Sequence, residues 1–109
     1  MGALSTIASL KPKNFRHIIF NNFAHDSVGG QPTAAFYIDI PKIAKANGYV
    51  NAFQVETKDE IINSMKKLKS IKGPALIEIR VNKGARKDLG RPTTTPIENK
   101  EEFMRFLAD

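Results

Sequence analysis

The sequence predicts an α/β fold, with a mostly parallel sheet flanked by helices. Apolar runs rich in β-branched residues alternate along the chain with amphipathic stretches of helical period, and this order favours a parallel sheet. One apolar run, residues 17–20, ends in two carboxamides and a glycine-rich loop, which is typical of the ligand edge of an α/β sheet. With 109 residues, of which 41% are hydrophobic, the chain is one domain at most and can form a packed core.

The first predicted elements are a helix over residues 1–10 and a strand over residues 17–20. Leu4 and Ile7 recur at helical spacing, and Pro12 ends the helix. No capping residue precedes this helix, which opens with apolar residues at once. We therefore expect the chain to begin inside a longer domain.

A second helix and a second strand are predicted after the glycine-rich loop. Asp39 is the expected N-cap, because its carboxylate can accept a backbone N–H of the first turn, and Pro41 suits that turn. Gly48 marks the end of this helix. Residues 49–55 then alternate enough between apolar and polar side chains to form a short strand.

A third helix and the clearest strand follow. Thr57 and Glu60 form a capping box, which predicts a helix from there to about Ser70. Residues 75–81 have the strongest strand pattern in the chain. The alternation after Leu76 predicts that this strand lies at the flank of the sheet, with one wetter face.

The last part of the chain is predicted to be a basic loop and an amphipathic helix. The loop covers residues 82–95, and the helix covers residues 98–107. The predicted apolar side of this helix consists of Ile97, Phe103, Phe106 and Leu107.

Charge and composition narrow the classes of function. Seventeen Lys and Arg against eleven Asp and Glu give a net charge of +6, which fits either a soluble surface balanced by a missing partner segment or an anionic ligand. A nucleic-acid partner is not expected, because no basic motif is interleaved with aromatic residues. No run has the length and hydrophobicity of a membrane span. The lack of cysteine and of a basic leader predicts a cytoplasmic location.

Three residues near the strand exit have side chains suited to chemistry. The carboxamide oxygen of Asn22 suits Mg²⁺, which prefers oxygen ligands, but such a residue can also simply cap a turn. His25 and Asp26 place a group that titrates near neutral pH beside an anionic one, as proton transfer requires. A lone loop histidine is as often a surface residue, so both interpretations stay open.

Four ordered blocks of the sequence carry a family resemblance. They are residues 1–4, 21–33, 84–92 and 99–100. The two asparagines that open the second block are similar to the second half of the thiamine-diphosphate motif, which begins with Gly-Asp-Gly and closes with Asn-Asn. The chain thus resembles the phosphonopyruvate decarboxylases of the thiamine-diphosphate-dependent decarboxylase family, and less closely the sulfopyruvate decarboxylases.

The resemblance implies that thiamine diphosphate and Mg²⁺ are cofactors. By the pattern of the family, the side chain of Asn22 and the backbone carbonyl of Ala24 would bind the metal. The residues placed near the cofactor are Asn21, Ser27, Gly29 and Gly30. The principal carboxylate ligand, the Asp of Gly-Asp-Gly, would precede Met1 and is not in this chain.

Two arginines and one departure from the family pattern complete the candidate site. Arg86 and Arg91 lie in the basic loop, and a guanidinium matches the oxygens of a phosphonate. The same loop can instead dock on a neighbouring subunit. Phe23 stands where the family usually has a small residue, so its side chain either crowds the cofactor's diphosphate or turns outward.

The sequence therefore predicts that residues 1–109 form one partial domain, the C-terminal part of the cofactor-binding domain of a 2-oxo-acid decarboxylase. The expected substrate of the complete enzyme is phosphonopyruvate, a small anionic 2-oxo acid, and the chain alone is expected to be inactive. The alternatives are a fragment of a sulfopyruvate decarboxylase subunit and a non-catalytic assembly module. Expected partners are other copies of the chain, the N-terminal half of the enzyme, or both, and neither nucleic acid nor a membrane.

An open sheet edge is also expected at the strand over residues 17–20. Without a strand on its outer side, its backbone groups would be unpaired, and Leu4 and Ile7 would be exposed on the first helix. Such surfaces recruit another chain, so we expect a two-fold dimer with residues 1–20 near the contact.

Overall fold

The computed structural model describes residues 2–108. Its elements are α1 (Gly2–Leu10), β1 (Arg16–Asn21), β2 (Ala24–His25), η1 (Asp26–Val28), β3 (Gln31–Pro32), η2 (Ala34–Phe36), α2 (Ile40–Asn47), β4 (Asn51–Val55), α3 (Lys58–Ser70), β5 (Ala75–Arg80) and α4 (Pro96–Ala108). Here η1 and η2 are single 3₁₀ turns. The main sheet is parallel, in the order β1-β5-β4, and β2 and β3 form a short antiparallel hairpin beside it.

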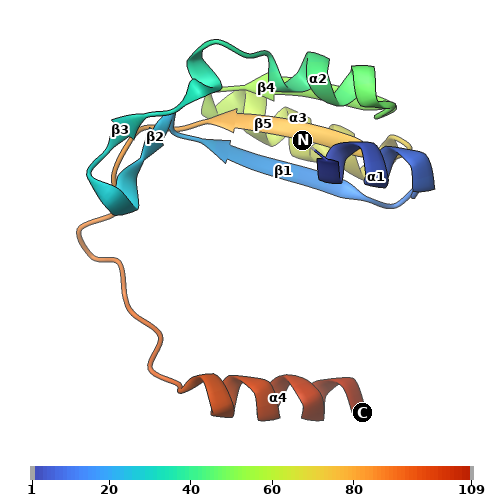
Figure 1. Ribbon diagram of the computed structural model, residues 1–109. Helices are drawn as coiled ribbons and strands as arrows, with labels where there is room; N and C mark the ends of the chain where they lie inside the picture. Colours follow the sequence, from blue (N-terminus) through green and yellow to red (C-terminus); the bar gives the residue numbers. More distant parts are fainter. Residues whose placement is uncertain (1, 109) are drawn as a thin grey trace.

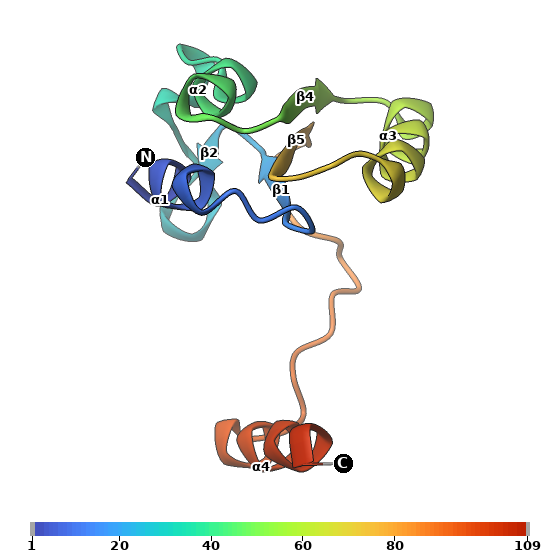
Figure 2. The same cartoon turned by 90° about the vertical axis from the view of Figure 1, so that its right-hand side faces the viewer.

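Helices cover both faces of the main sheet, as the predicted α/β class requires. Helices α1 and α2 lie on one face, and α3 lies on the other (Figure 1, Figure 2). The first core cluster joins α1, α2 and the sheet through Ala8, Ala44, Tyr49, Ala52 and Leu76. The second joins α3 and the sheet through Val55, Leu68, Ala75, Ile77 and Ile79. The mostly parallel sheet flanked by helices is confirmed.

The position predicted for the last strand is wrong. β5 is the central strand, pairs in parallel with both neighbours, and is buried from Ala75 to Ile79. Glu78 is part of the alternation that predicts a wetter face, yet only 3% of its surface is exposed. Its carboxylate accepts a hydrogen bond of 2.6 Å from Asn21 Nδ2 on β1. A buried charged group with a hydrogen-bond partner can therefore interrupt an apolar pattern without facing water.

The predicted helix ends of α2 and α3 are confirmed. Asp39 caps α2 by accepting the Lys42 N–H, and this hydrogen bond, more than any other contact, lowers the pKa of the Asp39 carboxyl. Gly48 follows α2 with a φ of 109°, the left-handed conformation that glycine adopts readily. Thr57 and Glu60 form both hydrogen bonds of the capping box at the start of α3.

Helix α1 is attached to the core by one side. Ala8 is buried in the first core cluster, and Leu4 and Ile7 pack against that cluster. Both are half-buried, whereas exposed side chains were expected. Met1 lies outside the described residues. The remaining shallow groove between α1 and α2, of about 240 Å³, is lined almost entirely by apolar side chains, among them Leu4 and Ile19.

Arg16 ties the start of β1 to the end of α3. Its Nε donates to Leu68 O at 2.7 Å, and one terminal nitrogen donates to Ile71 O. The other terminal nitrogen donates to the carbonyls of Lys13 and Phe15. A cation there satisfies carbonyls that have no partner within the helix and complements the negative end of the helix dipole.

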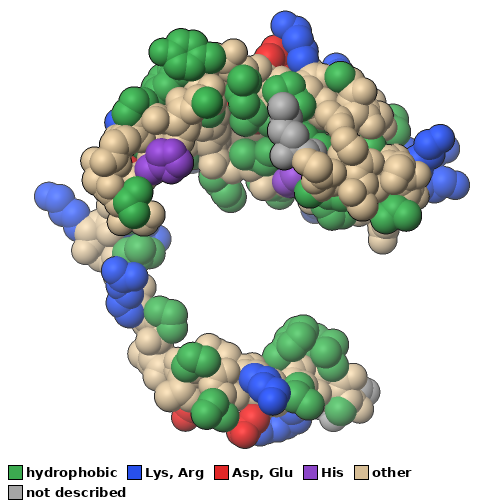
Figure 3. Space-filling model, viewed as in Figure 1, with side chains coloured by type: hydrophobic (Ala, Val, Ile, Leu, Met, Phe, Trp, Pro, Cys, Tyr) green, Lys and Arg blue, Asp and Glu red, His purple; other side chains and the backbone are tan. Residues whose placement is uncertain are grey.

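Helix α4 lies apart from the rest of the molecule. An extended segment, residues 82–95, leads from β5 to it, and the chain has the outline of an open C (Figure 1, Figure 3). The predicted amphipathic helix is present, but none of its residues is buried. Its exposed apolar side chains are Ile97, Phe103, Met104, Phe106 and Leu107. Within residues 2–108, no helix has the length and hydrophobicity needed to cross a membrane.

Candidate functional site

The parallel sheet places three polar strand ends at one edge. Because β1, β5 and β4 run in the same direction, their carboxyl ends meet at the same edge, where α/β proteins bind ligands. Asn21 ends β1 and Asn22 follows it, Glu56 follows β4, and Arg80 ends β5. The candidate site is built from these residues and from the loop that begins at Phe23.

Both the nitrogen and the oxygen of the Asn21 carboxamide form hydrogen bonds within the protein. Its Nδ2 donates to Glu78, and its Oδ1 accepts the Phe23 N–H at 2.9 Å. The residue is buried, with 7% of its surface exposed. These contacts let Asn21 join the core to the turn that leaves β1, and its assignment to the cofactor stays a prediction.

Asn22 and Ala24 present two oxygens at the edge of the sheet. Asn22 Oδ1 accepts the Ala24 N–H at 3.1 Å. The side chain therefore does cap the turn, which is one of the two interpretations of this residue. A carboxamide oxygen has two lone pairs, and one remains for a metal. In the hairpin, Phe23 O accepts the Thr33 N–H and His25 O accepts the Gly30 N–H. Ala24 lies between them, opposite Pro32, at a position whose carbonyl points away from the neighbouring strand. A carboxamide and a carbonyl oxygen fit Mg²⁺, as the sequence predicts.

Asp26 connects the loop after β1 to the segment after β5. Its Oδ2 accepts from Asn22 Nδ2 at 2.7 Å and from the Gly84 N–H at 2.9 Å. Lys83 Nζ donates to Gly30 O at 3.1 Å. The structure thus brings the start of the basic loop against the glycine-rich loop, although more than fifty residues separate them in the sequence.

The other predicted loop residues lie on the surface of this edge. The side chain of His25 is exposed and has no hydrogen-bond partner among residues 2–108, and Ser27 is exposed on η1. Gly29 and Gly30 have φ values of 107° and 73°. Both values are in the left-handed region, so the tight backbone path expected of these two glycines is present.

Arg86 and Arg91, the two arginines of the basic loop, do not line the cavity that opens at this edge of the sheet. Arg86 forms an ion pair with Asp88, with a nitrogen–oxygen distance of 2.8 Å. This hydrogen bond raises the pKa of Arg86 and lowers the pKa of Asp88. Arg91 is exposed. Contact of either residue with a phosphonate stays a prediction.

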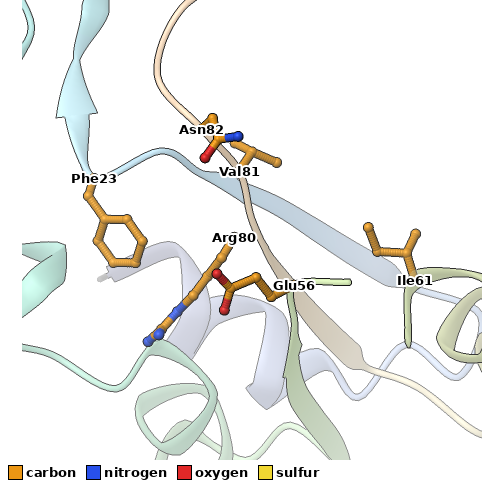
Figure 4. A pocket seen from close by; sticks show the side chains of 6 residues that line it. All are labelled: Phe23, Glu56, Ile61, Arg80, Val81 and Asn82. Atoms are coloured by element: carbon orange, nitrogen blue, oxygen red, sulfur yellow. The ribbon is translucent and has the colours of Figure 1, made fainter. Parts of the chain in front are cut away.

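A cavity of about 490 Å³ opens at the same edge. It is lined by Phe23, Glu56, Ile61, Arg80, Val81 and Asn82 (Figure 4). The Phe23 ring stacks on Phe36, with 4.6 Å between the ring centroids, and lies 5.2 Å from the guanidinium carbon of Arg80. Phe23 therefore turns toward Arg80 and Phe36. It does so from a left-handed backbone with a φ of 58°, a conformation that is uncommon for a bulky side chain.

Sequence reasoning did not single out Arg80 or Glu56. Both stand at the carboxyl ends of strands, as Asn21 does. A charged residue at that point of an apolar strand is the signal that would have identified them.

The family of the chain follows from comparison with known proteins. Residues 1–79 match the thiamine pyrophosphate enzyme, C-terminal TPP binding domain. The chain therefore belongs to this family. Thiamine pyrophosphate, the cofactor in the family's description, is another name for thiamine diphosphate.

Two phosphonopyruvate decarboxylases are similar to the whole chain. The protein of Streptomyces viridochromogenes is 32% identical over 99% of the chain, and that of Streptomyces hygroscopicus is 33% identical over 100% of it. The chain spans 27% of the length of each. The sulfopyruvate decarboxylase subunit beta of Methanococcus maripaludis is 28% identical over 98% of the chain, which spans 57% of that protein.

We predict that Asn21 and Asn22 differ in their effect on stability. Asn21→Ala should lower the free energy of unfolding by about 1–3 kcal/mol, because it leaves the buried Glu78 carboxylate without its partner. Asn22→Ala, at a half-exposed position, should cost less than about 1 kcal/mol. Urea unfolding of both variants gives the two values. A loss well below about 1 kcal/mol in the Asn21 variant would show that the Asn21–Glu78 hydrogen bond does not support the fold.

Proposed function

We propose that the chain is the cofactor-binding part of a thiamine-diphosphate-dependent 2-oxo-acid decarboxylase, and that phosphonopyruvate is its substrate. The observation that carries the proposal is the pair of oxygens from Asn22 and Ala24, at the ligand edge of a domain of this family. The substrate assignment is supported by the names of the two Streptomyces relatives. The reaction would take up one proton and convert phosphonopyruvate to phosphonoacetaldehyde and CO₂.

The residues of the sheet edge have distinct parts in this proposal. Asn22 Oδ1 and the Ala24 carbonyl would hold Mg²⁺, and the backbone of Gly29 and Gly30 would help to bind the diphosphate. Asn21 holds the turn in place from the core. Bound thiamine diphosphate supplies the electron sink that cleavage of the bond to the carboxylate requires.

Of the two residues that the sequence predicts for proton transfer, His25 and Asp26, we propose only His25 for this role. The Asp26 carboxylate already accepts two hydrogen bonds, from Asn22 and Gly84, so its part is to position the loop. His25 is exposed beside it, and an imidazole is the side chain most often used for general acid–base catalysis.

The domain is proposed to work in an assembly. We assign residues 1–109 to one C-terminal domain that joins other copies, a polypeptide with the remaining half of the site, or both. The name of the Methanococcus maripaludis relative identifies that protein as one subunit of an enzyme. In this chain, β1 is a terminal strand of the sheet within residues 2–108, and Phe20 on it is 71% exposed. The exposed apolar side of α4 is a further surface for assembly.

Sulfopyruvate is the second candidate substrate. The observation in its favour is the similarity to a sulfopyruvate decarboxylase subunit. Sulfonate and phosphonate groups are both tetrahedral anions, so the same kind of basic site can bind either substrate.

We predict that the chain binds thiamine diphosphate in a Mg²⁺-dependent manner, and that Asn22→Ala weakens this binding. Loss of one oxygen ligand should cost about 1–3 kcal/mol, which corresponds to roughly 5–150-fold in affinity. Calorimetric titration with and without Mg²⁺ measures the effect. Asn63→Ala, on the exposed side of α3, is the matched control. Unchanged affinity in the Asn22 variant would assign this residue to the turn alone.

A second prediction concerns activity. The purified 109-residue chain, supplied with thiamine diphosphate, Mg²⁺ and phosphonopyruvate, should form no phosphonoacetaldehyde, because the expected carboxylate ligand of the metal is not in this sequence. A partner that contributes the remaining half should restore product formation. The same assay with sulfopyruvate separates the two substrates. Product from the chain alone would overturn the prediction.

A third prediction concerns self-association. The chain should sediment as a dimer at micromolar concentration, with residues 1–20 near the contact. Phe20→Ser should lower the dimer fraction, because a buried phenyl ring contributes a large apolar area to an interface. Tyr37→Ser, at a 90% exposed aromatic residue outside this stretch, is the control. A folded monomer would show that the open side of β1 does not recruit a second copy.

A further inference from the structure

Among residues 2–108, the guanidinium of Arg80 has no hydrogen-bond or ion-pair partner. Arg80 Nε is enclosed by protein atoms and, within residues 2–108, makes no hydrogen bond. Arg80 also forms no ion pair among these residues. An unpaired donor of this kind is rare in native proteins, and each case calls for an explanation such as a bound ion.

Two carboxylates lie near Arg80, and neither pairs with it. Asp39 caps α2 through the Lys42 N–H and forms an ion pair of 3.0 Å with Lys42 Nζ. The Lys42 backbone hydrogen bond is the main reason why the pKa of Asp39 is lowered, and the charge of Arg80 adds a smaller part. Glu56 lines the same cavity as Arg80, but it is not within ion-pair distance of the guanidinium. The positive charge of Arg80 is therefore available to a ligand.

Phe23 holds Arg80 in an orientation that suits anion binding. The guanidinium lies over the Phe23 ring, and Phe36 stacks on that ring. An aromatic ring over the face of a guanidinium leaves the terminal N–H donors, which lie in the plane of the group, free. Figure 4 shows the Arg80 side chain running along the cavity wall between Phe23 and Glu56. These donors form the planar fork that pairs with the oxygens of a phosphonate or carboxylate.

We propose that Arg80 binds a tetrahedral oxyanion in this cavity, and that the anion is the phosphonate or sulfonate end of the substrate. The assignment to a substrate rests on the function proposed above. A cavity of about 490 Å³ accommodates a three-carbon acid as well as its anionic group. Asn82 adds a carboxamide to the same wall, and Glu56 adds a negative charge that limits the affinity for a dianion.

Arg80 is a better candidate for binding this anion than the two arginines that the sequence predicts for it, Arg86 and Arg91. Arg86 is exposed and already paired with Asp88, and Arg91 is exposed beyond it. Neither lines the cavity. An interaction with an anion is worth more at Arg80, because water competes less with a partly enclosed guanidinium than with an exposed one.

The test is a titration of the full chain with inorganic phosphate and then with methylphosphonate, followed by NMR of the arginine Nε–H groups. We expect a saturable shift of the Arg80 resonance. Arg80→Gln should weaken phosphate binding about tenfold or more, and Glu56→Gln should strengthen it. Arg105→Gln, with the same charge change on exposed α4, should leave the affinity unchanged.

Arg80→Lys covers the case in which Arg80→Gln does not fold. Lysine keeps the charge but lacks the fork, so affinity should still fall several-fold in a folded variant. The proposal is overturned if the chain shows no saturable binding, if folded Arg80 variants bind like the original chain, or if the shifts occur at Arg86 and Arg91.

Titration of the same variants with thiamine diphosphate and Mg²⁺ separates this inference from the proposed function. We expect Arg80→Gln to keep its cofactor affinity within about twofold, because the metal ligands are contributed by the loop after β1. Competition between methylphosphonate and thiamine diphosphate would assign Arg80 to the cofactor's diphosphate and overturn the substrate assignment. Methylphosphonate binding at Arg80 without any cofactor binding would contradict the proposed function and leave the anion site established.

Discussion

The central position of β5 is the constraint on which the rest of the structure depends. β5 pairs in parallel on both sides, and its side chains alternate between two apolar clusters, one under each layer of helices. Parallel pairing aligns the carboxyl ends of three strands, so Asn22, Glu56 and Arg80 reach one edge from distant parts of the sequence. The site is thus a consequence of the same pairing that forms the core.

One buried hydrogen bond links that core to the site. Glu78 in β5 accepts from Asn21, and the other end of the Asn21 carboxamide holds the Phe23 N–H. A change at Glu78 therefore acts on the turn that presents Asn22 and Ala24. This arrangement gives Asn21 the part of supporting the turn and leaves Asn22 as the residue that we propose for the metal.

Two surfaces of the chain extend beyond the site. The loop after β1 and the segment after β5 are joined through Asp26 and Gly84, and the chain then leaves the sheet toward α4. That helix has an exposed apolar side, and β1 has an open outer edge within residues 2–108. Both features are typical of a domain that works together with another chain, and the name of one relative, a subunit of a decarboxylase, agrees with this.

The sequence by itself determined what depends on neighbouring residues. The Asp39 cap, the capping box at Thr57 and the left-handed Gly48 are local contacts, and the resemblance in residues 21–33 located the loop of the candidate site. The tertiary structure alone decided the place of β5, because the burial of Glu78 depends on Asn21, which is 57 residues away. It also decided the role proposed for Arg80. The ring beside its guanidinium comes from a different part of the chain, and no local pattern records which charged group lacks a partner in the folded protein.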